Sequence, residues 1–173
     1  MGIDPGYALI GYGVISYDCG RFKTLNFGAI TTPSDMPFPA RLEVIYRDIN
    51  QLLSEFKPDA LSIEKLFFNT NTTTAIDVAQ ARGTIVLAAQ MNKVPIFEYT
   101  PMQVKQAVVG YGKAEKKQVI SMVTLMLGLK EPPKPDDTAD AIAIAICHAH
   151  TGGSGLGKYY NQPTAIGGML KGQ

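Results

Sequence analysis

The sequence predicts one α/β domain with a mixed five-stranded sheet and helices on both faces of that sheet. The order of the elements favours this class: strand-like segments come first, and later strand-like segments alternate with helical ones. That order is typical of a sheet that begins antiparallel and continues through helical crossovers. The length of 173 residues, of which 46% are hydrophobic and 18% charged, suits a single globular core.

The first three predicted elements are antiparallel strands. Residues 1–4 form a very short strand that ends at a Pro-Gly turn. Residues 7–17 combine β-formers with glycines, which indicates a strand with bends. After a turn at residues 18–21, residues 22–31 return as the second arm of a hairpin.

Helices and strands alternate in the middle of the chain. Apolar side chains recur at spacings of three and four over residues 42–56, which predicts a helix, and Pro58 ends it. Residues 60–66 and 94–99 are short apolar runs that predict strands. Between them, residues 72–90 are apolar and Ala-rich enough for a long helix.

The last part of the domain is predicted to be helical. Thr100 offers a hydroxyl cap, and Pro101 is a favoured first residue of a helix. Glycines at 110–112 interrupt this helix, and residues 114–127 continue as a second one. A proline-rich connector then leads into a final helix over residues 137–150.

Residues 1–150 are therefore expected to form the folded domain, and residues 151–173, rich in Gly and polar side chains, a weakly ordered tail. The formal net charge is only +1, so any basic surface must be local. We expect no membrane segment, because no apolar run reaches the roughly 18 residues of a span. Cys19 and Cys147 are far apart, which argues against a disulfide framework or a zinc site and fits a reducing cytoplasm.

Four acidic residues fall at informative positions in this scheme. Asp4 closes the first strand, and Glu64 lies within the apolar fourth strand. Asp137 and Asp140 open the last helix, and their spacing places both carboxylates on one face of its first turn. Hard divalent cations prefer oxygen ligands, so four converging carboxylates could hold two Mg²⁺ ions. Two such ions, roughly 3.5–4 Å apart, clamp the attacking and leaving oxygens of a phosphodiester displacement.

Each acid also has a purely structural interpretation. Asp4 could be only a turn residue. Asp137 and Asp140 could be ordinary capping residues of a helix N-terminus. Glu64 is harder to explain, since a buried glutamate needs a partner and the adjacent Lys65 points to the opposite face. The joint pattern of all four favours the metal site.

Several stretches carry motifs in register over residues 2–150: GIDPG (2–6), GYGVI (11–15), IEKLFF (63–68), AQARG (79–83), FEYTPMQVKQAVVGYGKAEKKQV (97–119) and DDTADAIAIAICHAH (136–150). Taken together, they resemble the RuvC family of Holliday-junction resolvases. The resemblance implies an RNase H-like nuclease domain over residues 1–150. It also implies that Asp4, Glu64, Asp137 and Asp140 take the places of the family's metal-binding catalytic acids.

The family resemblance also implies cofactors and partners. The cofactor would be Mg²⁺, with Mn²⁺ as a substitute, and two ions would occupy each active site. The enzyme would be a homodimer that nicks two opposed strands of four-way junction DNA symmetrically during recombination and repair, in cooperation with the branch-migration proteins RuvA and RuvB. Only Met1 precedes Gly2, where the family usually has a few more apolar residues, so Asp4 is expected on a short strand.

Three residues match family positions that contact DNA. Phe67 matches an aromatic residue that stacks on an unpaired base at the crossover, a contact worth roughly 1–3 kcal/mol. Lys105 and Lys116 match lysines that hold DNA near the metals. Without the resemblance, Phe67 and Phe68 could be core aromatics, and the lysines a solvated helix face. Arg82 could contact phosphate or form a salt bridge, and both alternatives stay open.

The long helix over residues 72–90 is apolar on more than one side, which is more than one sheet face can cover. This predicts packing against a second copy of the chain, although a helix of the same subunit could also cover it. Proteins of three other functions share parts of this pattern. An actin-like ATPase shares the early D-x-G but repeats it, and a nuclease for ribosomal RNA precursors fits the E-K-L-F-F and D-T-A-D segments less well. A non-catalytic junction binder would have lost its acids, and all four are present.

Overall fold

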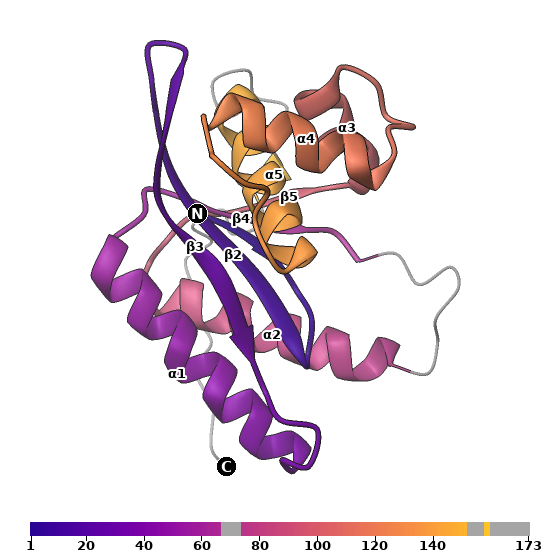
Figure 1. Ribbon diagram of the computed structural model, residues 1–173. Coiled ribbons are helices and arrows are strands. Elements are labelled where there is room, and N and C mark those ends of the chain that lie inside the picture. The colour runs from indigo at the N-terminus through magenta and orange to yellow at the C-terminus, as the bar shows by residue number, and fades with distance from the viewer. Residues whose placement is uncertain (67–73, 152–157, 160–173) are drawn as a thin grey trace.

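The protein forms a mixed sheet, seen in a computed structural model that describes residues 1–66, 74–151 and 158–159 (Figure 1). Within these residues the strand order is β3-β2-β1-β4-β5-β6. The strands are β1 (Gly2–Asp4), β2 (Leu9–Asp18), β3 (Arg21–Thr31), β4 (Leu61–Glu64), β5 (Ile96–Tyr99) and β6 (Lys158–Tyr159). Pairs β1–β2 and β2–β3 are antiparallel, whereas β1–β4 and β4–β5 are parallel. The predicted five-stranded mixed sheet is therefore confirmed, and β6 adds a two-residue antiparallel strand beside β5.

The hairpin of β2 and β3 forms as its sequence predicts. Asp18 pairs with Arg21, and the two turn residues, Cys19 and Gly20, have φ angles of 48° and 78°. Two positive φ angles in a two-residue turn match the right-handed twist of the flanking strands. The predicted bend is a register shift between Val14 and Ile15, which lets the hairpin curl away from the sheet.

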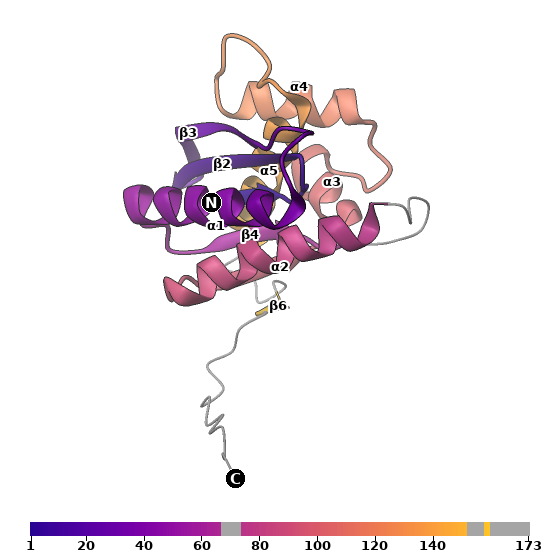
Figure 2. The same ribbon diagram turned by 90° about the horizontal axis from the view of Figure 1, so that it is seen from below.

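Helices cover both faces of the sheet (Figures 1 and 2). They are α1 (Phe38–Phe56), α2 (Ala75–Met91), α3 (Pro101–Val109), α4 (Lys116–Met126) and α5 (Asp136–Thr151). Helices α1 and α2 share one hydrophobic core with the sheet, and α3, α4 and α5 share a second core on the other face. None of the described helices is both long and apolar enough to cross a lipid bilayer. The α/β class predicted from the sequence, a mixed sheet with helices on both faces, is confirmed.

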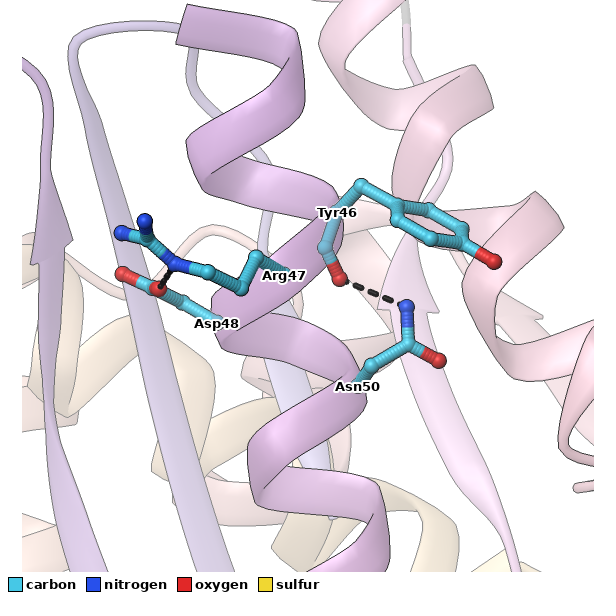
Figure 3. A network of polar contacts seen from close by, with 4 residues as sticks. All are labelled: Tyr46, Arg47, Asp48 and Asn50. Carbon is cyan, nitrogen blue, oxygen red and sulfur yellow. Dashed lines mark hydrogen bonds and ion pairs between the residues drawn. The ribbon is translucent and has the colours of Figure 1, made fainter.

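Polar contacts on α1 join it to α2. The amide of Asn50 donates to the carbonyl oxygen of Tyr46 at 2.7 Å, one turn earlier, beside an exposed pair between Arg47 and Asp48 at 3.0 Å (Figure 3). Asn92, the residue after α2, donates to the side-chain oxygen of Asn50 at 2.6 Å. This bond fixes the C-terminal end of α2 against α1 on the same face of the sheet.

Candidate active site

The ends of two neighbouring strands bring Asp4 and Glu64 to the same edge of the sheet. Each is the last residue of its strand, β1 and β4, and these strands run parallel with Ile3 beside Ile63. The carboxyl ends of parallel strands are where α/β sheets commonly place their sites. Glu64 was predicted within its strand, and the structure places it at the strand's end, because regular pairing with β5 stops at Tyr99.

Glycines let α5 lie directly on β1 and β2. A Cβ atom at Gly11 would lie 2.0 Å from the carbonyl oxygen of Asp137, and one at Gly2 would lie 2.1 Å from the carbonyl oxygen of Ala141. Any side chain at either position would push the helix away. Gly11 is also the register partner of Asp4 in the β1–β2 ladder. The first turn of α5 therefore lies over the end of β1, which brings the Asp137 backbone close to the strand pair that contains Asp4.

Thr138 ties the first turn of α5 to β3. Its side chain is buried, and its hydroxyl donates to the carbonyl oxygen of Gly28 at 3.1 Å. The helix begins at Asp136, so Asp137 lies inside the first turn and is not the N-cap residue that the capping interpretation required. Asp137 and Asp140 thus flank a buried anchor, which fixes the part of the helix that carries both.

The charges of the other three acids all act on Asp4, so the four carboxylates lie in one region. Burial, and next the charges of Glu64, Asp140 and Asp137, raise the pKa of Asp4 from 3.8 to about 8. Burial and then the charge of Asp140 raise the pKa of Glu64 from 4.5 to about 7. Burial also raises the pKa of Asp140, although Lys116 opposes the rise. Clustered carboxylates whose pKa values rise in this way are typical of sites that function with a cation or a shared proton.

Two lysines provide positive charge at this cluster. The Nζ atom of Lys116 lies 3.0 Å from a carboxylate oxygen of Asp140 and 3.8 Å from one of Asp136. Burial lowers the pKa of Lys116, but its hydrogen bond to Asp140 and the surrounding carboxylates outweigh that effect and raise it overall. The charge of Lys105 opposes the rise in the pKa of Glu64 but does not cancel it. The structure therefore brings both sequence-predicted lysines to the acids.

A small cavity of about 230 Å³ opens between these charged groups. Its polar lining comes from four side chains: Glu64, Lys105, Lys116 and Asp140. Its apolar wall is made by Pro101, Val104 and Val119 of α3 and α4. The cavity thus presents carboxylates and ammonium groups to the same space, an arrangement that suits a phosphate group approached together with cations.

The donor set at these four positions fits a hard divalent cation. Carboxylate oxygens are the ligands that Mg²⁺ and Mn²⁺ prefer, and the chain offers four of them at one edge of the sheet. Among the described residues, no three His, Cys, Asp or Glu side chains stand close enough together to form a ready-made metal cluster. Lys116 pairs with Asp140 there, so a cation would compete with an ammonium group for that carboxylate.

An RNase H-like sheet with acids at the ends of adjacent strands and on the helix above them defines a metal-dependent nuclease class. Comparison with known proteins agrees. The family model described as "Crossover junction endodeoxyribonuclease RuvC" matches residues 1–148. The RuvC protein of Alkaliphilus metalliredigens is 58% identical over 152 residues, 88% of this chain and 93% of that protein. That of Clostridioides difficile is 54% identical over 151 residues, 87% and 89% of the two chains.

Solved structures point to the same family. Thermus thermophilus RuvC superposes with a TM-score of 0.84 at 37% identity, covering 91% of this chain and 97% of that one. The same protein in complex with a Holliday junction substrate gives 0.83 at 35% identity, with the same coverage. The chain belongs to the RuvC family of crossover junction endodeoxyribonucleases, whose members are metal-dependent. The ATPase and ribosomal-RNA nuclease alternatives gain no support from these relatives.

Three more residues, Phe67, Arg82 and Thr138, bear on the site. Phe67 lies outside the described residues, so its predicted stacking role is not placed. Arg82 is engaged in an ion pair with Glu98 on the face of the sheet opposite the acids, which favours the salt-bridge alternative over phosphate contact. The anchoring role of Thr138 was not predicted from the sequence. Its one signal there is a hydroxyl group between two predicted ligands on an otherwise apolar helix.

Proposed function

We propose that this protein is a Holliday-junction resolvase that makes two symmetric nicks in opposed strands of four-way DNA junctions during recombination and repair. The observation that carries the proposal is the convergence of Asp4, Glu64, Asp137 and Asp140 on one sheet edge beside Lys105 and Lys116. The relative from Thermus thermophilus, described with a Holliday junction substrate, supports junction DNA as the substrate.

The four acids are proposed as catalytic metal ligands for Mg²⁺, with Mn²⁺ as a substitute and two ions in each site. When bound, such ions polarise the scissile phosphate and activate the attacking water. The chain's own part is to hold the carboxylates in place. Asp4 and Glu64 are fixed by the paired strands that end at them, and Asp137 and Asp140 by the helix turn that Thr138 anchors. Burial raises the pKa of both Asp4 and Glu64, so cation binding to the ionised carboxylates would release protons from them.

The lysines are proposed to hold the scissile strand. Lys105 and Lys116 line the cavity that Glu64 and Asp140 also line, so a phosphate entering it meets two ammonium groups. Lys116 pairs with Asp140 here, and it would become available to a phosphate group if Asp140 held a cation. Phe67, which follows β4 closely in the chain, is proposed to stack on an unpaired base at the crossover, as the family resemblance implies.

A homodimer is proposed because resolving a junction needs two symmetric cuts, and an isologous pair presents two sites with matching symmetry. The outer face of α2 supports it. Ile76, Gly83, Leu87 and Met91 share this face by helical spacing, and the three large side chains are exposed. At Gly83 an added Cβ would meet nothing within 4 Å, so a second helix could approach closely. The opposite face of α2 is buried on its own subunit through Ala81, Ile85, Ala88 and Ala89.

Two further parts of the proposal follow from the family resemblance and the chemistry. Branch migration must bring the junction to the enzyme, which makes RuvA and RuvB the expected partners. Cys19 and Cys147 are both free thiols, one exposed and one buried, which suits a reducing compartment such as the cytoplasm.

The test is a synthetic four-way junction incubated with protein and Mg²⁺, with products sized on a denaturing gel. Asp4→Asn, Glu64→Gln, Asp137→Asn and Asp140→Asn should each abolish cutting and leave junction binding largely intact. Asp136→Asn is the matched control, since this neighbouring acid of the same helix is outside the proposed ligand set. Full cleavage in excess chelator would contradict a metal-dependent mechanism. An Asp137 or Asp140 variant that cuts normally and loses only the ~1 kcal/mol of a helix cap would restore the capping interpretation.

A further inference from the structure

Arg82 contacts the end of β4 from the face of the sheet that α2 covers. It lies on α2, and its Nε atom is 3.4 Å from the carbonyl oxygen of Glu64, a long hydrogen bond. Its Nη2 atom forms an ion pair with the carboxylate of Glu98 on β5. Only 12% of the Arg82 side chain and 17% of the Glu98 side chain are exposed. One guanidinium group therefore bridges the ends of two adjacent strands in a nearly buried position.

The Arg82–Glu98 ion pair and the Glu64 carboxylate lie on opposite faces of the sheet. Ile63 and Glu98 are register partners in the β4–β5 ladder, and Ile63 packs in the core that α2 shares. Alternate residues of a strand face opposite sides, so the carboxylate of Glu64 points to the other face. There it lines the cavity with Lys105 and Asp140. Arg82 therefore touches the backbone of Glu64 without entering the proposed active site.

The backbone at Glu64 is where strand pairing ends. On its β1 side, the register of β4 extends only to Ile63, which pairs with Ile3. On its β5 side, the last bond is from the Lys65 amide to the carbonyl oxygen of Tyr99 at 2.8 Å. Glu64 thus has a register partner on the β5 side only, and Arg82 adds a hydrogen bond to its carbonyl oxygen.

We propose that Arg82 is a positioning residue: its guanidinium fixes the last peptide of β4 and thereby sets the direction in which the Glu64 carboxylate meets a divalent cation. The inference rests on the proposed function, because it concerns how a proposed metal ligand is aimed. Arginine suits the task, since its planar fork can serve the Glu64 carbonyl and the Glu98 carboxylate at once. A lysine ammonium of similar charge lacks that fixed fork.

Two single substitutions separate positioning from the ion pair. Arg82→Lys keeps the positive charge beside Glu98 and removes the bond to the Glu64 carbonyl. Glu98→Gln keeps the guanidinium at that carbonyl and removes the ion pair. Calorimetric titration of each protein with Mn²⁺ in the absence of DNA gives metal affinity, thermal melting gives stability, and single-turnover cleavage with junction binding separates the rate from the affinity for DNA.

We expect Arg82→Lys to weaken Mn²⁺ binding and slow single-turnover cleavage by about 10-fold to 100-fold with junction affinity unchanged, the range for groups that orient metal ligands. Glu98→Gln should lower the melting temperature and keep the wild-type Mn²⁺ affinity. Should Arg82→Lys fail to fold, the double variant Arg82→Gln, Glu98→Gln removes both buried charges together and should show the same loss of affinity.

The proposal is overturned if Arg82→Lys, or the double variant in its place, binds Mn²⁺ as tightly as wild type. It is equally overturned if Glu98→Gln loses as much Mn²⁺ affinity as Arg82→Lys, since the ion pair alone would then matter. A wild-type protein that binds no Mn²⁺ and cuts no junction would instead contradict the proposed function. In that case the variants of Arg82 would have no metal ligand to position.

Discussion

The close approach of α5 to the sheet makes Gly11→Ala the most informative single change. Its new methyl group would lie 2.0 Å from the carbonyl oxygen of Asp137, a backbone atom that no side-chain rotation can move aside. An ordinary carbon–oxygen contact is about 3.3 Å, so the first turn of α5 and the end of β1 must separate by roughly 1 Å. That displacement acts directly between Asp4 and the helix turn that carries Asp137 and Asp140.

The change is expected to slow cleavage even at temperatures where the protein stays folded. Overpacking of this kind costs about 1–3 kcal/mol, which lowers the melting temperature by roughly 2–12 °C in a chain of this size. A misplacement of about 1 Å in a reacting constellation can cost on the order of 100-fold in rate. Single-turnover cleavage of a four-way junction, measured well below the melting temperature, should therefore fall about 100-fold while junction binding persists.

Gly28→Ala is the matched control for this change. Its methyl group would meet the Tyr12 hydroxyl at 2.9 Å, the far end of a flexible side chain packed in the core of α1 and α2. The substitution is thus the same, in the same sheet, but on the face away from the acids. It keeps the Gly28 carbonyl that accepts from Thr138, so cleavage should stay near wild type. A Gly11→Ala protein that cuts at the wild-type rate would refute the inference that contact between α5 and β2 sets the positions of the carboxylates.

Three further predictions use other parts of the molecule. The folded pKa of Asp4, about 8, lies above its ordinary value of 3.8, so its contribution to stability is complete below pH 4 and is lost as pH rises to about 8. The melting temperature of the metal-free protein should fall across that window, and Asp4→Asn should flatten the fall. Leu87→Glu should dissociate the proposed dimer in sedimentation at micromolar concentration, whereas Leu125→Glu, at a residue 74% exposed on α4, should not. Lys105→Ala and Lys116→Ala should each reduce the salt dependence of junction binding by about one unit of log–log slope.

Each of these has a contrary outcome. Stability that rises from pH 4 to pH 8 without metal would mean that Asp4 is ionised in the fold. Wild-type protein that sediments as a monomer, with or without junction DNA, would leave paired cutting unexplained. An unchanged salt slope in both lysine variants would return these residues to an ordinary solvated face.

Local patterns in the sequence were sufficient for most of the fold. Each element has its own signal: the turn of the β2–β3 hairpin, the three-and-four spacing of α1, and the Thr100 cap with Pro101 at α3. Thr100 accepts from the Gln103 amide at 3.2 Å, as a capping residue should. The element order then restricts the sheet to a few topologies, since crossover connections between parallel strands have a fixed hand. Asp137 and Asp140 could be placed on one helix face for the same reason, because their spacing is local.

The features that sequence could not supply all depend on contacts between distant segments. Gly11 was interpreted as a bend within a strand, and only the packing of α5, more than a hundred residues later, shows that the missing side chain is what matters. Glu64 was expected within its strand, because apolar neighbours cannot show where pairing with β1 stops. The ion pair of Lys116 with Asp140 likewise joins two helices whose packing no local pattern specifies.

Glu64 also depends on contacts between distant segments, and these come from both faces of the sheet. Glu64 is a half-buried carboxylate whose pKa is raised to about 7, so its own surroundings stabilise the ionised form poorly and its position depends on the backbone. Strand pairing fixes that backbone up to the last residue of β4, and Arg82 holds the peptide group where pairing becomes one-sided. Arg82 comes from α2, the helix whose outer face is proposed to meet the second subunit. The helix proposed to join the two subunits is thus also the one that holds the Glu64 backbone, so loosening α2 is expected to weaken cation binding as well as dimerisation.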